Sequence, residues 1–217
     1  APSYWEPRSG IAYCRPKIFR VDTDTGDRSV ISGSSVGAGP RFECPRSLAM
    51  GADGYLYVLN SSATGYTPPA VLRVDLANGN RAIVSDPTHG SGPLWGGFIS
   101  MAGDARGSLY GADVSGAITR LLRVDAGTGA RSILSGDGVG TGEALGFAYS
   151  IAMAADGSIL VNNEVRTVLR VDPVTGDRTV LFRESGSGLA VVPALAPEPG
   201  TAALALVTFA TLAARTR

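Results

Sequence analysis

The sequence is short of the residues that most often build reactive sites. Its 217 residues include one histidine, His89, and two cysteines, Cys14 and Cys44. This scarcity excludes zinc-finger frameworks, histidine-rich metal sites and a small domain held by many disulfides. Nineteen basic and nineteen acidic residues cancel, so no overall field favours nucleic acid or an anionic membrane. We therefore expect no nucleic-acid partner and no cofactor.

Lysine is also nearly absent, because Lys17 is the only one and the other cations are arginines. Arginine carries a planar fork of donors that suits paired contacts with carboxylates. The 29 glycines and 13 prolines stay below the level that is typical of disordered chains. The chain is therefore expected to fold, with its arginines in structural ion pairs.

Four copies of one segment recur along the chain. Each reads Arg-Val-Asp, with a glycine four positions after the aspartate and an arginine two positions after that glycine. The copies begin 53, 50 and 47 residues apart, at Arg20, Arg73, Arg123 and Arg170. A Ser-x-Ala segment recurs in step at Ser47, Ser100 and Ser150, and a Gly-x-Gly segment at Gly37, Gly90, Gly140 and Gly186. This recurrence indicates a repeat architecture.

Each repeat reads as β-strands, because short runs of Val, Ile, Leu and Tyr alternate with Gly, Asp, Asn and Thr. No stretch before residue 200 keeps a helical period. One repeat predicts strands at residues 47–50, 55–59, 71–75 and 81–85. A unit of about 50 residues with four antiparallel strands is typical of a β-propeller blade, since solenoid repeats of that length are mostly helical. The predicted fold is an all-β propeller.

The ends of the chain predict how the ring closes. The first hairpin lacks a first strand of its own in the sequence before it, because residues 11–14 fit only as its second strand. Residues 189–192 fit as its first strand, so the two termini would share one blade of a four-bladed ring without exposed edges. The alternative is a fragment of a larger propeller, because the sequence begins with Ala rather than Met.

The repeats resemble those of exported bacterial propellers with NHL-like or SMP-30-like blades. The Arg-Val-Asp…Gly-x-Arg segment and the Ala…Asp-Gly…Leu-Tyr-Val segment carry the resemblance, which covers about residues 11–192. It implies the architecture but no particular activity, because propellers support many functions. SMP-30-like lactonases hold a channel metal with Glu, Asn and Asp, and that set does not map onto this chain residue by residue.

The composition changes after residue 192. A short segment at 193–199 contains Pro197, Glu198 and Pro199, and residues 200–214 carry no charge before Arg215 and Arg217. As a helix these fifteen residues would be about 22 Å long, shorter than the bilayer core, and they have no amphipathic face for docking on the propeller. The expected division is 1–10, an N-terminal segment; 11–192, the propeller; 193–199, a linker; and 200–217, an apolar helix.

The order of Pro-Glu-Pro, apolar helix and terminal arginines resembles the PEP-CTERM sorting signal, which exosortases of Gram-negative bacteria recognise. The resemblance implies an exosortase-type processing enzyme as partner and a transient inner-membrane contact through residues 200–217. The arginines would stay in the cytoplasm and present Pro197–Pro199 on the outer side. Export also needs a secretory signal peptide, and the N-terminal Ala fits either its cleavage or a truncation.

One face of the propeller is expected to bind ligands. Antiparallel strands place the loops between blades and the loops between second and third strands on the same end of the ring, where propeller ligands usually bind. The polar and aromatic side chains of these loops are the candidates, although a solvated loop position is the commoner role for each: Glu43, His89, Trp95, Asp113, Glu143, Asn162 and Glu164.

Two other motifs have simpler explanations. Residues 22–27 superficially suggest a calcium loop, but the other copies lack the second acid, so a turn capped by its first aspartate is favoured. The Gly-x-Gly segments lack the strand-to-helix context of phosphate loops, so loop geometry is favoured. His89 has no evident catalytic partner, and neither cysteine lies in a nucleophile motif.

Two contacts are predicted within the propeller. Because Arg and Asp share a face of each Arg-Val-Asp strand, we expect ion pairs such as Asp75 with Arg81 or Arg73. Cys14 and Cys44 flank the first hairpin and an exported protein meets an oxidising compartment, so the two cysteines are candidates for a disulfide, which requires Cα atoms less than about 7 Å apart.

The favoured function is an exported protein of the cell surface or extracellular matrix that binds an extracellular polysaccharide or a surface protein. The alternative is a metal-dependent hydrolase or lyase in the central channel, which would need a cluster of acid, Asn or His side chains there.

Overall fold

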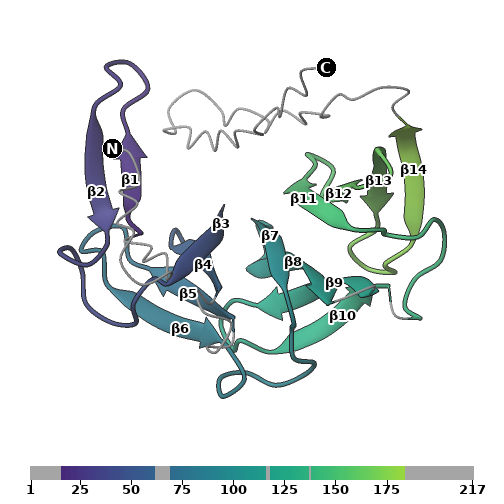
Figure 1. Cartoon of the computed structure of the whole chain (residues 1–217), viewed down its shortest axis with the longest axis horizontal. Helices are drawn as coiled ribbons and strands as arrows, with labels where there is room; N and C mark the ends of the chain where they lie inside the picture. Colours follow the sequence, from purple (N-terminus) through teal and green to yellow (C-terminus); the bar gives the residue numbers. More distant parts are fainter. Residues whose placement is uncertain (1–15, 62–68, 116–117, 137, 184–217) are drawn as a thin grey trace, which may run out of the picture.

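The computed structural model describes residues 16–61, 69–115, 118–136 and 138–183, which form β-sheets without a helix (Figure 1). We name the sheets blades 1 to 4. Blade 1 is the antiparallel hairpin of β1 (Ile18–Val21) and β2 (Arg28–Ser32). Blade 2 has four antiparallel strands, β3 (Cys44–Met50), β4 (Leu56–Ser61), β5 (Ala70–Val74) and β6 (Arg81–Ser85).

Blades 3 and 4 repeat the order of blade 2. Blade 3 contains β7 (Phe98–Gly103), β8 (Ser108–Ser115), β9 (Ile118–Asp125) and β10 (Arg131–Ser135). Blade 4 contains β11 (Ala148–Met153), β12 (Ile159–Asn163), β13 (Thr167–Val171) and β14 (Arg178–Arg183). The all-β prediction and the four-stranded repeat are confirmed.

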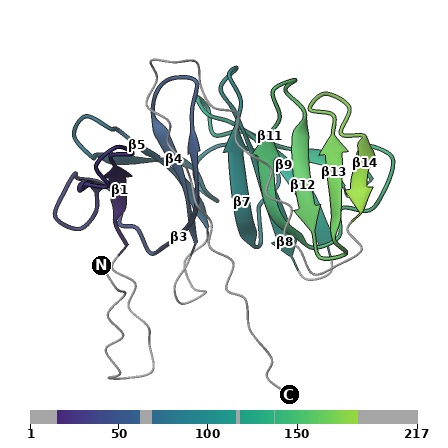
Figure 2. The same ribbon diagram turned by 90° about the horizontal axis from the view of Figure 1, so that it is seen from above.

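The blades stand side by side around a common centre, with β3, β7 and β11 innermost (Figures 1 and 2). The described residues leave the arc open between blade 1 and β14 (Figure 1). The strands expected at 11–14 and 189–192, and the helix expected at 200–217, lie outside the described residues. Ring closure by shared termini therefore stays a prediction.

The core lies between neighbouring blades. In β4, Leu56 and Val58 pack toward blade 1, whereas Tyr57 and Leu59 pack toward blade 3, and all four are at most 1% exposed. A strand whose side chains alternate between two covered faces is apolar at every position. This explains why the second strand of a repeat reads as a continuous hydrophobic run.

A repeated junction, which we call the lock, joins each blade to the next. It combines the last serine of one blade, the Gly-x-Gly loop after it, and the hairpin glycine and arginine of the following blade. The three locks comprise Ser32, Gly37, Gly39, Gly79 and Arg81; Ser85, Gly90, Gly92, Gly129 and Arg131; and Ser135, Gly140, Gly142, Gly176 and Arg178.

The lock explains both glycine motifs. A Cβ on Gly90 would lie 2.0 Å from the Gly129 carbonyl oxygen, and a Cβ on Gly92 would lie 2.0 Å from that of Arg131. Both glycines also have φ near +80° to +100°, a conformation that side chains disfavour. The Ser85 hydroxyl donates to the Gly129 carbonyl at 2.6 Å. The three Gly-x-Gly segments within the described residues are thus positions of close backbone approach, which agrees with the loop-geometry interpretation.

The predicted ion pairs of Asp75 are wrong. One Asp75 oxygen accepts the Ala77 N–H at 2.8 Å and the other accepts the Asn78 amide at 2.8 Å, so the aspartate caps its own turn. The Arg81 guanidinium instead reaches the preceding blade, and that of Arg73 lies 4.4 Å from the Tyr55 ring centroid. Within the described part of the chain, Asp75 pairs with neither arginine.

Candidate functional site

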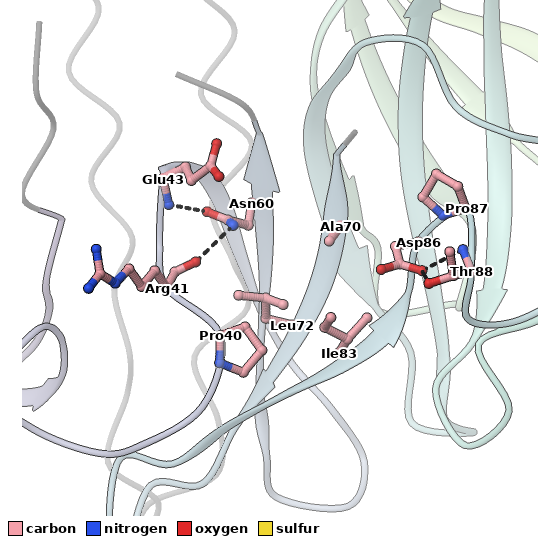
Figure 3. Close-up of a pocket in the computed structure, with 10 residues that line it drawn as sticks. All are labelled: Pro40, Arg41, Glu43, Asn60, Ala70, Leu72, Ile83, Asp86, Pro87 and Thr88. Carbon is pink, nitrogen blue, oxygen red and sulfur yellow. Dashed lines mark hydrogen bonds between the residues drawn. The ribbon is translucent and has the colours of Figure 1, made fainter. Parts of the chain in front are cut away.

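The candidate site is a pocket of about 310 Å³ on blade 2. Its apolar floor consists of Leu72, Ile83 and Ala70, which come from the last two strands (Figure 3). Charged and polar groups of the two loops that flank the blade surround this floor. The full lining is Pro40, Arg41, Glu43, Asn60, Ala70, Leu72, Ile83, Asp86, Pro87 and Thr88.

Asn60 holds one wall of the pocket in place. Its side-chain oxygen accepts the Glu43 N–H at 2.9 Å, and its amide donates to the Arg41 carbonyl at 3.3 Å (Figure 3). Both bonds use backbone atoms of Arg41 and Glu43, so the side chains of these two residues remain available for other contacts. Arg41 points away from the floor (Figure 3). Among the ligand-face residues predicted from the sequence, Glu43 is the one that lines this pocket.

Asp86 organises the opposite wall. Its Oδ1 accepts the backbone N–H groups of Thr88 and His89, each at 2.7 Å. Partial burial alone would raise the pKa of Asp86, but hydrogen bonds from His89 and Thr88 outweigh this effect and lower the pKa. Asp86 is therefore anionic at neutral pH, and one of its oxygens points toward Ala70 (Figure 3).

The polar position of Asn60 recurs in the other blades as a loop anchor. Asp113, fully buried, accepts the N–H groups of Gly96 and Gly97 at 2.9 Å and pairs with Arg120 at 3.0 Å. Asn163, 2% exposed, donates to the Leu145 carbonyl at 3.1 Å. These bonds join the loops between blades to the ends of second strands, so the two loop classes meet at one face, as expected.

Several predicted candidates have structural contacts instead of a place at the pocket. Trp95 is 6% exposed, its indole donates to the Pro69 carbonyl at 2.8 Å, and its ring lies 5.1 Å from the Arg131 guanidinium. The Glu143 carboxylate pairs with Arg183 at 3.0 Å. The Glu164 carboxylate accepts the Phe147 N–H at 3.3 Å. The structure brings none of these three to the blade 2 pocket.

His89 lies behind the pocket wall. Its ring contacts Asp86 at 2.9 Å and its carbonyl accepts the Arg131 guanidinium at 2.9 Å. It lines a second, more polar hollow of about 440 Å³ together with Arg73 and Thr128. In the part of the chain that the structure describes, no group of three or more His, Cys, Asp or Glu side chains is placed to hold a metal ion.

The loop anchor of blade 4 lies one residue after the position predicted from the sequence. Asn162, one of the candidates, is half-buried beside Asn163, and Asn163 is the residue that holds the loop. A signal was present, because Asn60, Asp113 and Asn163 each lie 13 residues after the serine of the Ser-x-Ala segment. Counting from that serine would have identified the anchor in all three blades.

Some predictions fall outside the described residues. They are the disulfide partner Cys14 and the sorting residues Pro197, Glu198, Pro199, Arg215 and Arg217. Cys44 is half-buried at the start of β3. Over the described ranges there is no helix with the length and hydrophobicity to cross a membrane.

Comparison with known proteins decides the fold. No protein-family model and no curated protein matches the sequence. TolB from Acinetobacter baumannii, a β-propeller protein, is similar with a TM-score of 0.54 and 18% identity, over 79% of this chain and 39% of TolB. The fold is that of a β-propeller.

Other solved structures are similar at comparable levels. A protein of unknown function from Bacteroides thetaiotaomicron gives a TM-score of 0.50 at 14% identity, over 78% of this chain and 39% of that one. A chain of the nidogen/laminin complex gives 0.48 at 13% identity, over 80% and 73%. This chain thus spans less than half the length of TolB and of the Bacteroides protein, and identities this low show the fold alone.

Proposed function

We propose that this chain is an exported propeller that acts by binding, at the cell surface or in an extracellular polysaccharide matrix. The observation that carries the binding role is the blade 2 pocket, where an apolar floor is framed by charged side chains on the loop-bearing face. Ligand pockets in proteins typically combine an apolar lining with a few placed polar groups. The backbone bonds of Asn60 and Asp86 form this pocket before a ligand arrives.

A partner for this pocket offers an apolar face together with donor groups. The carboxyl groups of Asp86 and Glu43 can accept hydrogen bonds, and Leu72 and Ile83 provide the apolar contact. Hydroxyl-rich polysaccharides and peptide segments of surface proteins both have this mixed character. We propose an extracellular polysaccharide as the partner, with a surface protein as the competing outcome of the test.

The binding test uses the full chain and two blocking variants. Pro87→Arg fills the mouth of the pocket from an exposed position, and Glu43→Gln removes one carboxylate charge. Ala52→Arg, on the exposed turn between β3 and β4 at the opposite end of the blade, is the matched control. We expect both pocket variants to lose at least fivefold affinity for polysaccharide purified from the host's matrix, with the control unchanged.

Equal retention of all variants on the polysaccharide would contradict a role for the pocket. If the pocket variants reduce binding to protease-treated cells but the protein does not bind the purified polysaccharide, the proposal of a polysaccharide partner is contradicted. Pocket-dependent binding that protease treatment of the cells abolishes would identify a surface protein.

The delivery part of the proposal rests on the sequence of the tail. Pro197, Glu198 and Pro199, an uncharged span and two terminal arginines follow each other in the order of an exosortase sorting signal. We propose that the span enters the inner membrane and that an exosortase-type enzyme cleaves near the Pro-Glu-Pro motif. Cleavage then releases the propeller to the outside.

The sorting test compares two substitutions of similar chemistry, in a chain supplied with a signal peptide and expressed in an exosortase-competent Gram-negative host. Replacing Pro197, Glu198 and Pro199 together by alanine is expected to leave the protein uncleaved in the inner membrane. Pro193→Ala, outside the motif, is expected to be processed and delivered normally. Normal delivery of the triple variant, or processing in a host that lacks exosortase, would contradict the sorting proposal.

A further inference from the structure

The hollow that contains His89 lies next to the blade 2 pocket, because Ile83 and Thr88 line both. We call this space of about 440 Å³ the polar hollow. Two of its side chains are basic, Arg73 and His89, and its described lining contains no Asp or Glu. The blade 2 pocket differs, because two carboxylate side chains line it. The polar hollow is therefore suited to a group with negative charge.

Arg73 differs from the equivalent arginines of blades 3 and 4. The Arg123 Nε donates to the Ser108 hydroxyl at 2.9 Å, and Arg170 forms an ion pair with an aspartate of its own blade. In blade 2 the position of Ser108 is taken by Tyr55, and the Arg73 guanidinium lies 4.4 Å from the centroid of its ring. Over the described ranges the Arg73 side chain makes no hydrogen bond and no ion pair. Contact with an aromatic face leaves the N–H groups of the guanidinium available to a ligand.

The turn that carries His89 is also a departure from the repeat. In the first and third locks the equivalent turn begins with glycine and ends with valine, at residues 33–36 and 136–139. In the second lock it runs from Asp86 to His89, and the same backbone bond closes it, from the Asp86 N–H to the His89 carbonyl at 3.1 Å. The turn therefore needs neither an acid nor a histidine to form. Departures from a repeat that its fold does not require are expected at functional sites.

The Asp86 carboxylate determines which ring nitrogen of His89 carries the hydrogen. The Nδ1 atom lies 2.9 Å from Asp86 Oδ1, and because a carboxylate only accepts, Nδ1 is the donor. The His89 side chain is 52% exposed, and its Nε2 atom makes no hydrogen bond to a described residue. Nε2 accepts hydrogen bonds in the neutral ring and donates after protonation. An anion in the polar hollow therefore favours the protonated ring.

The other charged groups around His89 have partners of their own. Arg131, on β10, donates to the His89 and Asp86 carbonyls at 2.9 and 2.8 Å. Asp125, before the turn between β9 and β10, accepts two N–H groups of that turn at 3.0 and 2.7 Å and does not line the polar hollow. Within the described lining, Arg73 on β5 is thus the permanent charge that an anion in the hollow meets.

We propose that the polar hollow binds the carboxylate of an acidic sugar, with the Arg73 guanidinium and the protonated His89 ring as donors. A guanidinium matches a carboxylate through two parallel hydrogen bonds. Because the polar hollow adjoins the blade 2 pocket, a polysaccharide that fills the pocket reaches the hollow with its neighbouring sugar units. The choice of a sugar rests on the proposed function, whereas the choice of an anion rests on the hollow itself.

The single histidine of the chain provides a direct test, because histidine ring signals in an NMR spectrum come from His89 alone. Sodium glucuronate is added to the full chain at about pH 6, where histidine titrates. Glucose is the uncharged counterpart, and sodium chloride controls for ionic strength. We expect glucuronate to shift the His89 signals to saturation, and glucose and chloride to leave them in place.

Two arginine variants show whether the response depends on the hollow. Arg106, on the turn between β7 and β8, is exposed, and its side chain makes no hydrogen bond to a described residue. Arg73→Gln is expected to weaken glucuronate binding at least about fivefold, the loss typical of a hydrogen bond to a charged group. Arg106→Gln removes the same charge elsewhere and is expected to bind like the natural protein. Equal affinities of all three proteins would overturn the proposal.

The ligand and the pH give two further outcomes. With glucuronate bound, the His89 ring is expected to take up its proton at a pH about 0.3 unit higher or more, because the anion stabilises the positive charge. An equal response to glucose and glucuronate would overturn the proposal. A tighter response to N-acetylaspartate than to glucuronate would overturn the sugar, because an acidic side chain of a protein would then be the better ligand.

Glu43→Gln separates this inference from the proposed function. Glu43 lines the blade 2 pocket and not the polar hollow, so this variant should keep the full glucuronate response. If the matrix polysaccharide binds in a Glu43-dependent way while glucuronate leaves the His89 signals unshifted, the blade 2 pocket stands and the polar hollow is overturned. A saturating glucuronate response without polysaccharide binding supports the polar hollow and contradicts the polysaccharide partner.

Discussion

At the scale of single residues, arginine has a different role from the one that the sequence indicates. Arg131 is 6% exposed, and its guanidinium donates to the Ser85 hydroxyl at 2.6 Å and to the Asp86 and Pro93 carbonyls at 2.8 and 2.9 Å. Burial lowers its pKa, yet guanidinium groups remain charged at neutral pH. The charge is therefore balanced by backbone dipoles from the preceding blade.

Arg131→Ala should lower the free energy of unfolding by about 3 kcal/mol or more, because it leaves several buried acceptors without a donor. Arg131→Lys should recover only part of this loss, since an ammonium group cannot reach acceptors on both sides of the guanidinium. Urea denaturation with Arg106→Ala as control measures the difference. A loss below about 0.5 kcal/mol for Arg131→Ala would show that the lock contributes little.

The turn aspartates make the stability of the fold depend on pH in the acidic range. Backbone hydrogen bonds from Thr25, Thr128 and Thr175 lower the pKa values of Asp22, Asp125 and Asp172 respectively. A lowered folded-state pKa stabilises the fold above the unfolded value of about 3.9, and this contribution is lost as pH falls through the folded-state pKa. The melting temperature should therefore be level above about pH 5 and fall below about pH 4. A constant melting temperature down to pH 2.5 would contradict this assignment.

At the scale of elements, the repeat made the strands predictable. The fourth strand of blade 2 was expected at 81–85 and is found at Arg81–Ser85, and Leu72 and Val74 share one face as the period of two requires. The partner of Arg81 was not predictable in the same way. Alternation within a strand shows which side chains share a face, but the acceptors lie 41 to 49 residues earlier, on the preceding blade. Contacts between repeats depend on how the blades stack.

The Gly-x-Gly loop provides a test at the same scale. Gly54 and Gly90 have nearly the same φ, +79° and +78°, but only the Cβ position of Gly90 lies against a carbonyl oxygen, at 2.0 Å. Gly54→Ala should cost about 1 kcal/mol through backbone strain alone. Gly90→Ala adds a clash between blades and should cost at least about 2 kcal/mol more. If urea denaturation gives the same loss of unfolding free energy for the two variants, the Gly-x-Gly loop accommodates the added methyl group at no further cost.

At the scale of the whole molecule, the sorting proposal assigns delivery to a part of the sequence that lies outside the described propeller core. The described core consists of three clusters between blades, and every residue in them precedes residue 172. Residues 193–217 contain no copy of the strand, hairpin or Gly-x-Gly segments. The sorting proposal requires this tail to be accessible to a processing enzyme, and accessible segments contribute little to a packed core.

Removal of residues 193–217 should therefore change the melting temperature by less than about 2 °C, within the range of surface changes in a domain of this size. Removal of residues 184–217 should lower it further, because the shorter chain also lacks the last Gly-x-Gly segment. Differential scanning calorimetry of the two shortened chains and of the full protein distinguishes the contribution of residues 184–192 to stability from that of residues 193–217. A large loss on removal of 193–217 alone would mean that the tail packs on the blades, and a processing enzyme would then have to displace it before cleavage.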